Sequence, residues 1–259
     1  MPAVQILVDE IHAGLRKAWV FAFGATDVPG APPKPEYVCT VTVAESLLPA
    51  LTGTPGAVVK LEENVQEFAA GCLALPNFPK LSPRPRIRSR KTKSKGDRER
   101  VDIAIQARNV GIPISRALVE LKISNAIGGL LADLIRNQQL MQLASPGRQN
   151  QLDAAMLGFV VVDDKSRGAV AGQKVLGNLA KHYEQIARRF LSPDYVTELS
   201  VRQISLPPED EDDEFIHMVS IVITFARPFA ASAPTPNRVP WFWSKSSAHD
   251  TVALDLQAL

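Results

Sequence analysis

The chain has 259 residues, of which 46% are hydrophobic and 22% charged, and this balance excludes a disordered or fibrous protein. No run of about 18 uncharged apolar residues occurs, so the sequence predicts no membrane span and no membrane partner. The first apolar stretch lacks a cationic leader, and the two cysteines and four histidines show no metal-binding spacing. We therefore expect a reduced, cytoplasmic protein.

The net charge of +2 conceals a strongly basic segment, residues 80–100. Ten lysines and arginines stand there against two acidic residues, so the basic segment carries +8 and the rest of the chain −6. Such a concentration of charge attracts polyanions through phosphate contacts, which predicts DNA as the partner. A solvated loop without a partner is the alternative. The residues expected to contact DNA are Arg84, Arg86, Arg88, Arg90, Lys91, Lys93 and Lys95.

Apolar spacing predicts two helices at the start of the chain. Residues 4–23 and 36–51 carry apolar side chains every three or four positions. Residues 57–68 read as a strand. After the basic segment, the alternating residues 100–108 and the apolar residues 114–123 predict an antiparallel pair of strands.

A helix at about 126–142 follows, and we expect Ile135 to share its inward face with the leucines. The nearly unbroken apolar run 156–162 predicts a strand covered on both faces. A long helix at about 168–190 and two strands within 196–225 complete the pattern. This order of elements predicts an α/β protein with a mixed β-sheet flanked by helices.

Three charged residues interrupt the apolar central strands. Glu120 and Lys122 lie two positions apart and so point to one face, while Asp102 belongs to the neighbouring strand. If the two strands pair, Asp102 approaches Glu120, since opposed Cβ atoms lie about 5 Å apart. Two carboxylates this close need a proton or a cation between them, and Mg²⁺ is the usual cation. A structural ion pair is the alternative, but buried ion pairs add little to stability.

Asp102, followed at strand-pair spacing by Glu120-Leu121-Lys122, resembles the PD-(D/E)xK nuclease superfamily, with its restriction-endonuclease-like fold. There a helix precedes three strands, and a helix and a further strand follow. The resemblance implies one restriction-endonuclease-like domain at 1–226, with its core at about 36–165, an extra N-terminal helix and additional C-terminal strands. Val101 stands where the motif has proline. The Pro/Ala-rich residues 227–259 are then a C-terminal tail.

The same resemblance implies a site. Asp102 and Glu120 would hold Mg²⁺, with Mn²⁺ as a substitute, and Lys122 would position the attacking water. A further glutamate would assist from the first helix, for which Glu36 is the best match. Glu45 on another face of that helix and Glu62 on the first strand remain alternatives.

Three functions are therefore open. The first is a Mg²⁺-dependent deoxyribonuclease that hydrolyses DNA phosphodiesters in defence or DNA processing, as a homodimer or with an accessory protein. The second is a catalytically idle copy of the same fold that binds nucleic acid or assembles with a partner. The third is an unrelated binding domain in which the three charged residues are only structural. Intact ligands and the basic segment favour the nuclease.

Overall fold

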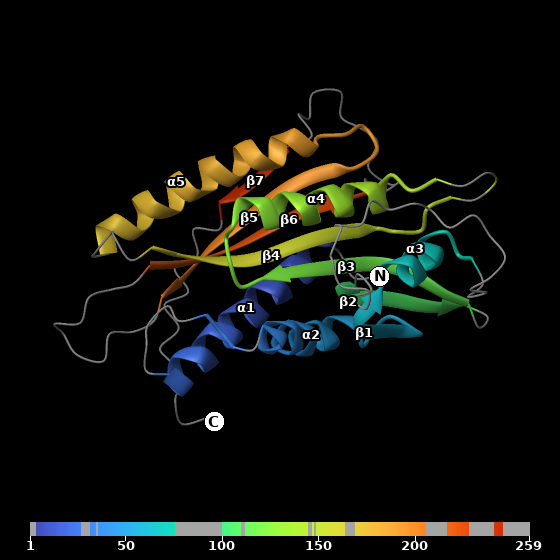
Figure 1. Ribbon diagram of the computed structural model, residues 1–259, viewed down its shortest axis with the longest axis horizontal. Helices are drawn as coiled ribbons and strands as arrows, with labels where there is room; N and C mark the ends of the chain where they lie inside the picture. The colour runs from blue at the N-terminus through green and yellow to red at the C-terminus, as the bar shows by residue number, and fades with distance from the viewer. Residues whose placement is uncertain are drawn as a thin grey trace.

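A mixed β-sheet lies between helices in the computed structural model of the protein (Figure 1). The structure describes residues 4–26, 32–34, 36–75, 100–109, 112–144, 147, 149–163, 169–205, 217–227 and 241–245. The strands are β1 (Ala57–Asn64), β2 (Arg100–Asn109), β3 (Ile112–Lys122), β4 (Ala154–Asp163), β5 (Val196–Ser205), β6 (His217–Ala226) and β7 (Trp241–Lys245). The helices are α1 (Val4–Thr26), α2 (Tyr37–Leu51), α3 (Val65–Cys72), α4 (Ile127–Met141) and α5 (Ala169–Ala187), which continues into the 3-10 turn η1 (Arg188–Phe190).

Six strands follow the order β1-β2-β3-β4-β6-β5, and the short strand β7 adds to β5 at the edge. The predicted antiparallel pair is confirmed as β2 and β3, with Ile103 opposite Val119. β3 and β4 are parallel neighbours, and α4 connects them, because a parallel pair requires a crossover. The predicted α/β class with a mixed, helix-flanked sheet is confirmed.

The two faces of the sheet carry separate hydrophobic cores. α1 and α2 cover one face, and α3, α4 and α5 cover the other (Figure 1). Val119 and Leu121 of β3 join the core under α1 and α2, whereas Leu118 joins the core under α4. Since successive strand residues alternate between faces, Glu120 and Lys122 share the face of Leu118.

The strand predicted at 57–68 is too long. β1 ends at Asn64, whose side-chain oxygen accepts hydrogen bonds from the N–H groups of Gln66 (2.9 Å) and Glu67 (3.4 Å). This arrangement is an N-cap, so the chain turns into the helix α3 at Val65. Local capping therefore overrides the valine-rich strand pattern.

The inward face predicted for α4 is also partly wrong. Ile135 is 46% exposed, and the buried residues of α4 include two polar side chains. These buried residues are Leu130, Asp133, Leu134, Asn137, Leu140 and Met141. Positions three or four apart form one helical face, and Ile135 lies on the opposite side of the helix.

Residues 241–245 are not a plain tail. They form β7, parallel to β5, with Trp241 opposite Thr197. The predicted tail at 227–259 therefore contributes a strand to the sheet.

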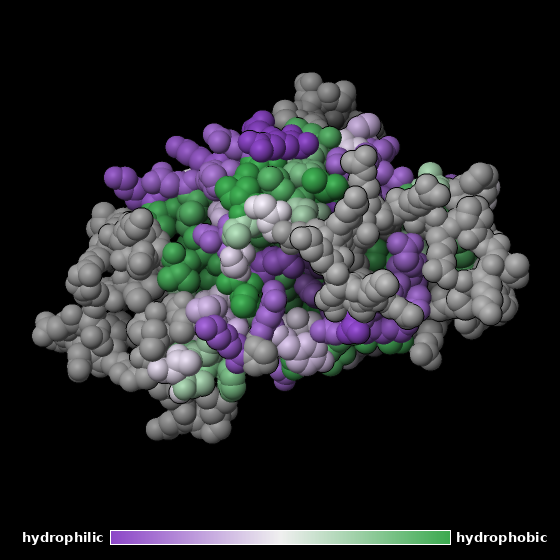
Figure 2. Space-filling view, viewed as in Figure 1, coloured by the Kyte–Doolittle hydropathy of each residue, from purple (hydrophilic) through white to green (hydrophobic). Residues whose placement is uncertain are grey.

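The surface of α5 illustrates how the helices sit on the sheet. Val175, Ala180, Tyr183 and Ile186 are buried. Figure 2 shows hydrophilic side chains gathered along the outer side of this helix. Among the described helices none is both long and apolar enough to cross a membrane.

Candidate functional site

The charged residues of β3 lie beneath α4. Glu120 is 1% exposed, and the side chain of Lys122 is 28% exposed. Both continue the face begun by Leu118, so the β period brings them side by side.

Asp102 joins them at the point where the ladder between β2 and β3 ends. The last residue pair in register there is Ile103 with Val119. One residue further, Asp102 Oδ2 accepts a hydrogen bond from the backbone N–H of Leu121 at 2.7 Å. The Asp102 carboxylate therefore takes the place of a ladder carbonyl and is held beside Glu120 and Lys122.

The helix α4 adds two charged side chains above these three residues. Lys122 Nζ lies 2.9 Å from Asp133 Oδ2. Arg136 Nη2 lies 3.0 Å from Asp133 Oδ1 and 2.6 Å from Glu120 Oε1. Asn137, one residue on, donates to the carbonyl of Met156 at 3.4 Å and ties α4 to β4. We call Asp102, Glu120, Lys122, Asp133 and Arg136 the charged cluster.

Burial raises the pKa of both strand carboxyl groups. The pKa of Glu120 lies well above its ordinary value because the group is buried, and Arg136 offsets this only in part. Burial also raises the pKa of Asp102, against the opposing effect of Lys122. Burial lowers the pKa of Lys122, but its carboxylate neighbours, Asp133 first, outweigh burial and raise it. The charged cluster thus keeps its lysine protonated, while burial disfavours the ionised form of both strand carboxyl groups.

The donor atoms suit Mg²⁺, which takes one or two carboxylates and completes its octahedron with waters and phosphate oxygens. Asp102 and Glu120 supply two carboxylates at one end of the β2–β3 ladder. Glu120 Oε1, although close to Arg136, accepts no hydrogen bond of regular geometry from the described residues. No group of three or more His, Cys, Asp or Glu side chains in the described ranges is arranged to hold a metal. A metal at this place would therefore have only the two carboxylates of Asp102 and Glu120 as protein ligands.

The three candidate glutamates lie in different places, and Glu36 comes first along the chain. It precedes the first turn of α2 and is exposed. Burial raises the pKa of the Cys39 thiol to about 12, and the carboxylates of Glu36 and Asp102 both add to the increase. Glu36 and Asp102 therefore both act electrostatically on this one thiol. Glu45 is exposed elsewhere on α2, and Glu62 forms an ion pair with Arg100.

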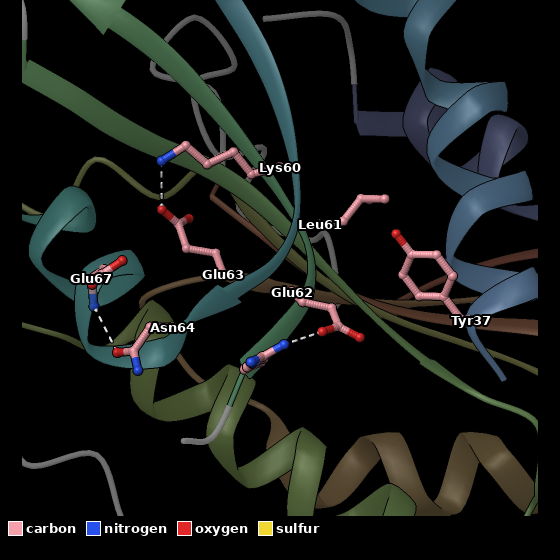
Figure 3. Close-up of a pocket in the computed structure, with 8 residues that line it drawn as sticks. Tyr37, Lys60, Leu61, Glu62, Glu63, Asn64 and Glu67 are labelled. Carbon is pink, nitrogen blue, oxygen red and sulfur yellow. Dashed lines mark hydrogen bonds and ion pairs between the residues drawn. The ribbon is translucent and has the colours of Figure 1, made fainter. Parts of the chain in front are cut away.

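A pocket of about 580 Å³ opens on the β1 side of this region (Figure 3). Residues 60–64 of β1 line it together with Tyr37 of α2, Glu67 of α3 and Arg100. Lys60 Nζ pairs with Glu63 Oε1 at 3.0 Å (Figure 3). The β1–β2 register places Glu62, which has a left-handed φ of 51°, across from Asp102. Glu62 of the pocket lining is thus one strand away from Asp102 of the charged cluster.

The residues predicted to contact DNA lie outside the described part of the chain. Arg84, Arg86, Arg88, Arg90, Lys91, Lys93 and Lys95 belong to this group. Arg100, the last residue of the basic segment, is described and begins β2 beside the pocket. The basic segment therefore enters the sheet two residues before Asp102.

Sequence reasoning missed Asp133 and Arg136. The two residues are three positions apart on α4 and form an ion pair beside its buried leucines. A pair of opposite charges at this spacing next to an apolar stripe was the sequence signal that pointed to them.

Comparisons with models of known protein families, with curated proteins and with solved structures find no match to this chain.

Proposed function

We propose that the protein is a metal-dependent nuclease that hydrolyses DNA phosphodiesters. One observation carries the proposal: Asp102, Glu120 and Lys122 come together where β2 and β3 part, with their carboxylates desolvated. Plain structure gains little from such a group, because desolvation opposes the Coulomb attraction of buried ions. The order of elements from α2 to β4 agrees with the resemblance to the PD-(D/E)xK superfamily, with α3 as an insertion.

Each residue has a role in this proposal. Asp102 and Glu120 would hold Mg²⁺, or Mn²⁺ in its place, and the bound metal would supply Lewis-acid activation of a water and of the phosphate. Lys122 Nζ would orient the attacking water and stabilise the negative charge that develops on the phosphate oxygens. As the water oxygen bonds to phosphorus, the opposite P–O bond breaks and the leaving oxygen departs in line. Glu36 would assist from the start of α2.

The basic segment would hold the DNA backbone without reading sequence, since phosphate contacts position a duplex but carry no base information. It leads directly into Arg100 and then Asp102, so a backbone gripped there would lie beside the charged cluster.

A second function has its own supporting observation. Arg136 lies against Glu120, and Lys122 lies against Asp133, so the charges of the cluster are largely satisfied by each other. A catalytically idle module that binds nucleic acid, or assembles with a partner, would retain this arrangement.

Plasmid nicking distinguishes the two functions. In Mg²⁺ or Mn²⁺, the wild type should relax supercoiled plasmid, and Asp102→Asn should lower the rate by about 10²-fold or more, since a carboxylate that holds the metal is lost. Asp194→Asn makes the same change on an exposed turn and should cut like the wild type. A folded wild type that cuts no DNA in either metal would leave the idle module.

A further inference from the structure

We propose that Arg136 is the internal counter-ion of Glu120 and must leave that carboxylate before a divalent cation binds between Asp102 and Glu120. The inference rests on the proposed function for the identity of the ligand as a divalent metal ion. Arg136 lies on α4 and is not one of the proposed metal ligands.

Arg136 is the ion-pair partner of Glu120. Arg136 Nη2 lies 2.6 Å from Glu120 Oε1, and no other cation in the described residues forms an ion pair with Glu120. Lys122 is turned towards Asp133. The guanidinium therefore occupies Oε1, one of the two oxygens with which Glu120 would bind a metal.

The charged cluster contains the carboxylates of Asp102, Glu120 and Asp133 and the cations Lys122 and Arg136. With all five groups ionised, it has one negative charge in excess. A divalent ion added beside Arg136 would reverse that to one positive charge and place like charges a few ångströms apart in a poorly solvated site. If Arg136 swings away, the metal and Lys122 together balance the three carboxylates.

Arg136 is bound to its two carboxylate partners through a single nitrogen atom. Both of its ion pairs use the same nitrogen, Nη2, instead of the two-pronged fork that makes arginine–carboxylate pairs strong. Its buried Nε has no hydrogen-bond partner among the described residues. The side chain is 14% exposed, so it reaches the surface of the cluster. A guanidinium held by one nitrogen can move without breaking a larger network.

The test is metal affinity measured on the whole chain. Arg136→Met keeps the length of the side chain and removes its charge, so the apo protein should melt lower while Mn²⁺ binds at least about tenfold more tightly by calorimetry. Arg136→Lys keeps the charge and should bind Mn²⁺ within a few-fold of the wild type. Arg188→Met, which removes an arginine from an exposed pair on α5 and η1, should leave the Mn²⁺ affinity unchanged. An Arg136→Met affinity equal to or weaker than the wild-type value overturns the proposal.

If Arg136→Met does not fold, the wild type itself decides. The side-chain Nε–Hε resonance of Arg136, assigned through Arg136→Lys, should shift as Mg²⁺ is added. Binding of Mg²⁺ without any change in that resonance overturns the proposal.

The outcomes separate this inference from the nuclease proposal. A protein whose Arg136→Met variant binds Mn²⁺ more tightly, but which nicks no plasmid, retains the counter-ion and loses the nuclease. A protein that nicks plasmid, with equal Mn²⁺ affinity in wild type and Arg136→Met, retains the nuclease and loses the counter-ion.

Discussion

The role of Lys122 depends on the residues that its side chain contacts. Its Nζ contacts Asp133 at 2.9 Å and also donates to the carbonyl of Leu121 at 3.2 Å. The side chain is partly exposed, and Asp133 retains Arg136 as a second partner. If Lys122 is removed, Asp133 therefore still has Arg136 as its cation.

Lys122→Met should separate chemistry from folding. We expect a loss of roughly 1–2 kcal/mol in the free energy of unfolding, less than the 3–5 kcal/mol of a fully buried pair. Cleavage should fall by about 10²- to 10³-fold, as for other positioned electrostatic groups. Melting curves measured beside the plasmid assay check both values. A variant that unfolds while the wild type shows no cleavage would make Lys122 a structural residue.

His12 is a buried neutral histidine that joins α1 to the sheet. Ser220 Oγ donates to the carbonyl of Arg202 at 3.2 Å, so it accepts the proton of His12 Nδ1 at 2.8 Å. His12 Nε2 then accepts from Ser200 Oγ at 2.9 Å. Burial, and to a smaller extent the positive charge of Arg202, lower the pKa of His12 from 6.5 to about 3.

His12 should make stability depend on pH in a defined window. The unfolded histidine gains a proton near pH 6.5 and the folded one only near 3, so acid favours the unfolded chain. The stabilisation is complete above about pH 6.5 and is lost between 6.5 and 3 at up to about 1.4 kcal/mol per pH unit. Urea unfolding of wild type and His12→Gln across this range measures the difference in slope. Parallel curves would contradict the assignment.

At the scale of elements, α1 and α2 cross at a glycine. A Cβ atom added to Gly14 would lie 2.4 Å from the Cα of Val43, which is closer than real contacts allow. Both residues are buried, and both helices contribute to the core beneath the sheet. The close approach of the two backbones therefore depends on the missing side chain.

Gly14→Ala should destabilise the protein although alanine favours a helix by about 1 kcal/mol. Overpacking against backbone atoms costs roughly 1–3 kcal/mol or more and should lower the melting temperature by several degrees. Gly24→Ala is the matched control on the same helix, because a Cβ there meets nothing within 4 Å. It should leave the melting temperature unchanged or raise it. Equal melting temperatures for the two variants would show that the helices separate freely.

At the scale of the molecule, charge is distributed unevenly along the chain. The basic segment carries +8 and leads into β2, while the charged cluster at the same end of the sheet has one negative charge in excess. In the proposed nuclease, the basic segment would attract the DNA backbone and the carboxylates would bind the metal that cleaves it.

Neutralising the basic segment should weaken DNA binding for all sequences alike. Replacing Arg86, Arg88, Arg90, Lys91 and Lys93 by glutamine removes up to five phosphate contacts. Each lost contact lowers the steepness of log affinity against log salt by about 0.9 on duplex DNA. Titrations at several salt concentrations measure the slope, with His12→Gln as a control that should leave it unchanged. An unaltered slope would place the DNA contacts on another surface.

The sequence alone was sufficient for most elements and for part of the site. Helix and strand periodicities are local, so the order of elements from α1 to β6 was predicted except for α3, whose first turn was assigned to the strand β1. The strand β7 was not predicted either. The shared face of Glu120 and Lys122 could be predicted because two residues two positions apart on one strand share a face wherever the strand lies. Asp102 followed from the antiparallel pairing of its strand with theirs.

Only the tertiary structure decided which residues of distant elements meet. Asp133 and Arg136 join the charged cluster because the crossover α4 packs one turn against the end of β3. His12 contacts Ser200 and Ser220, which are 188 and 208 residues further along the chain. These serines lie on β5 and β6, which become neighbours only in the folded sheet. A side chain's own sequence neighbours specify its face, but its partners depend on how layers pack, which is a property of the whole chain.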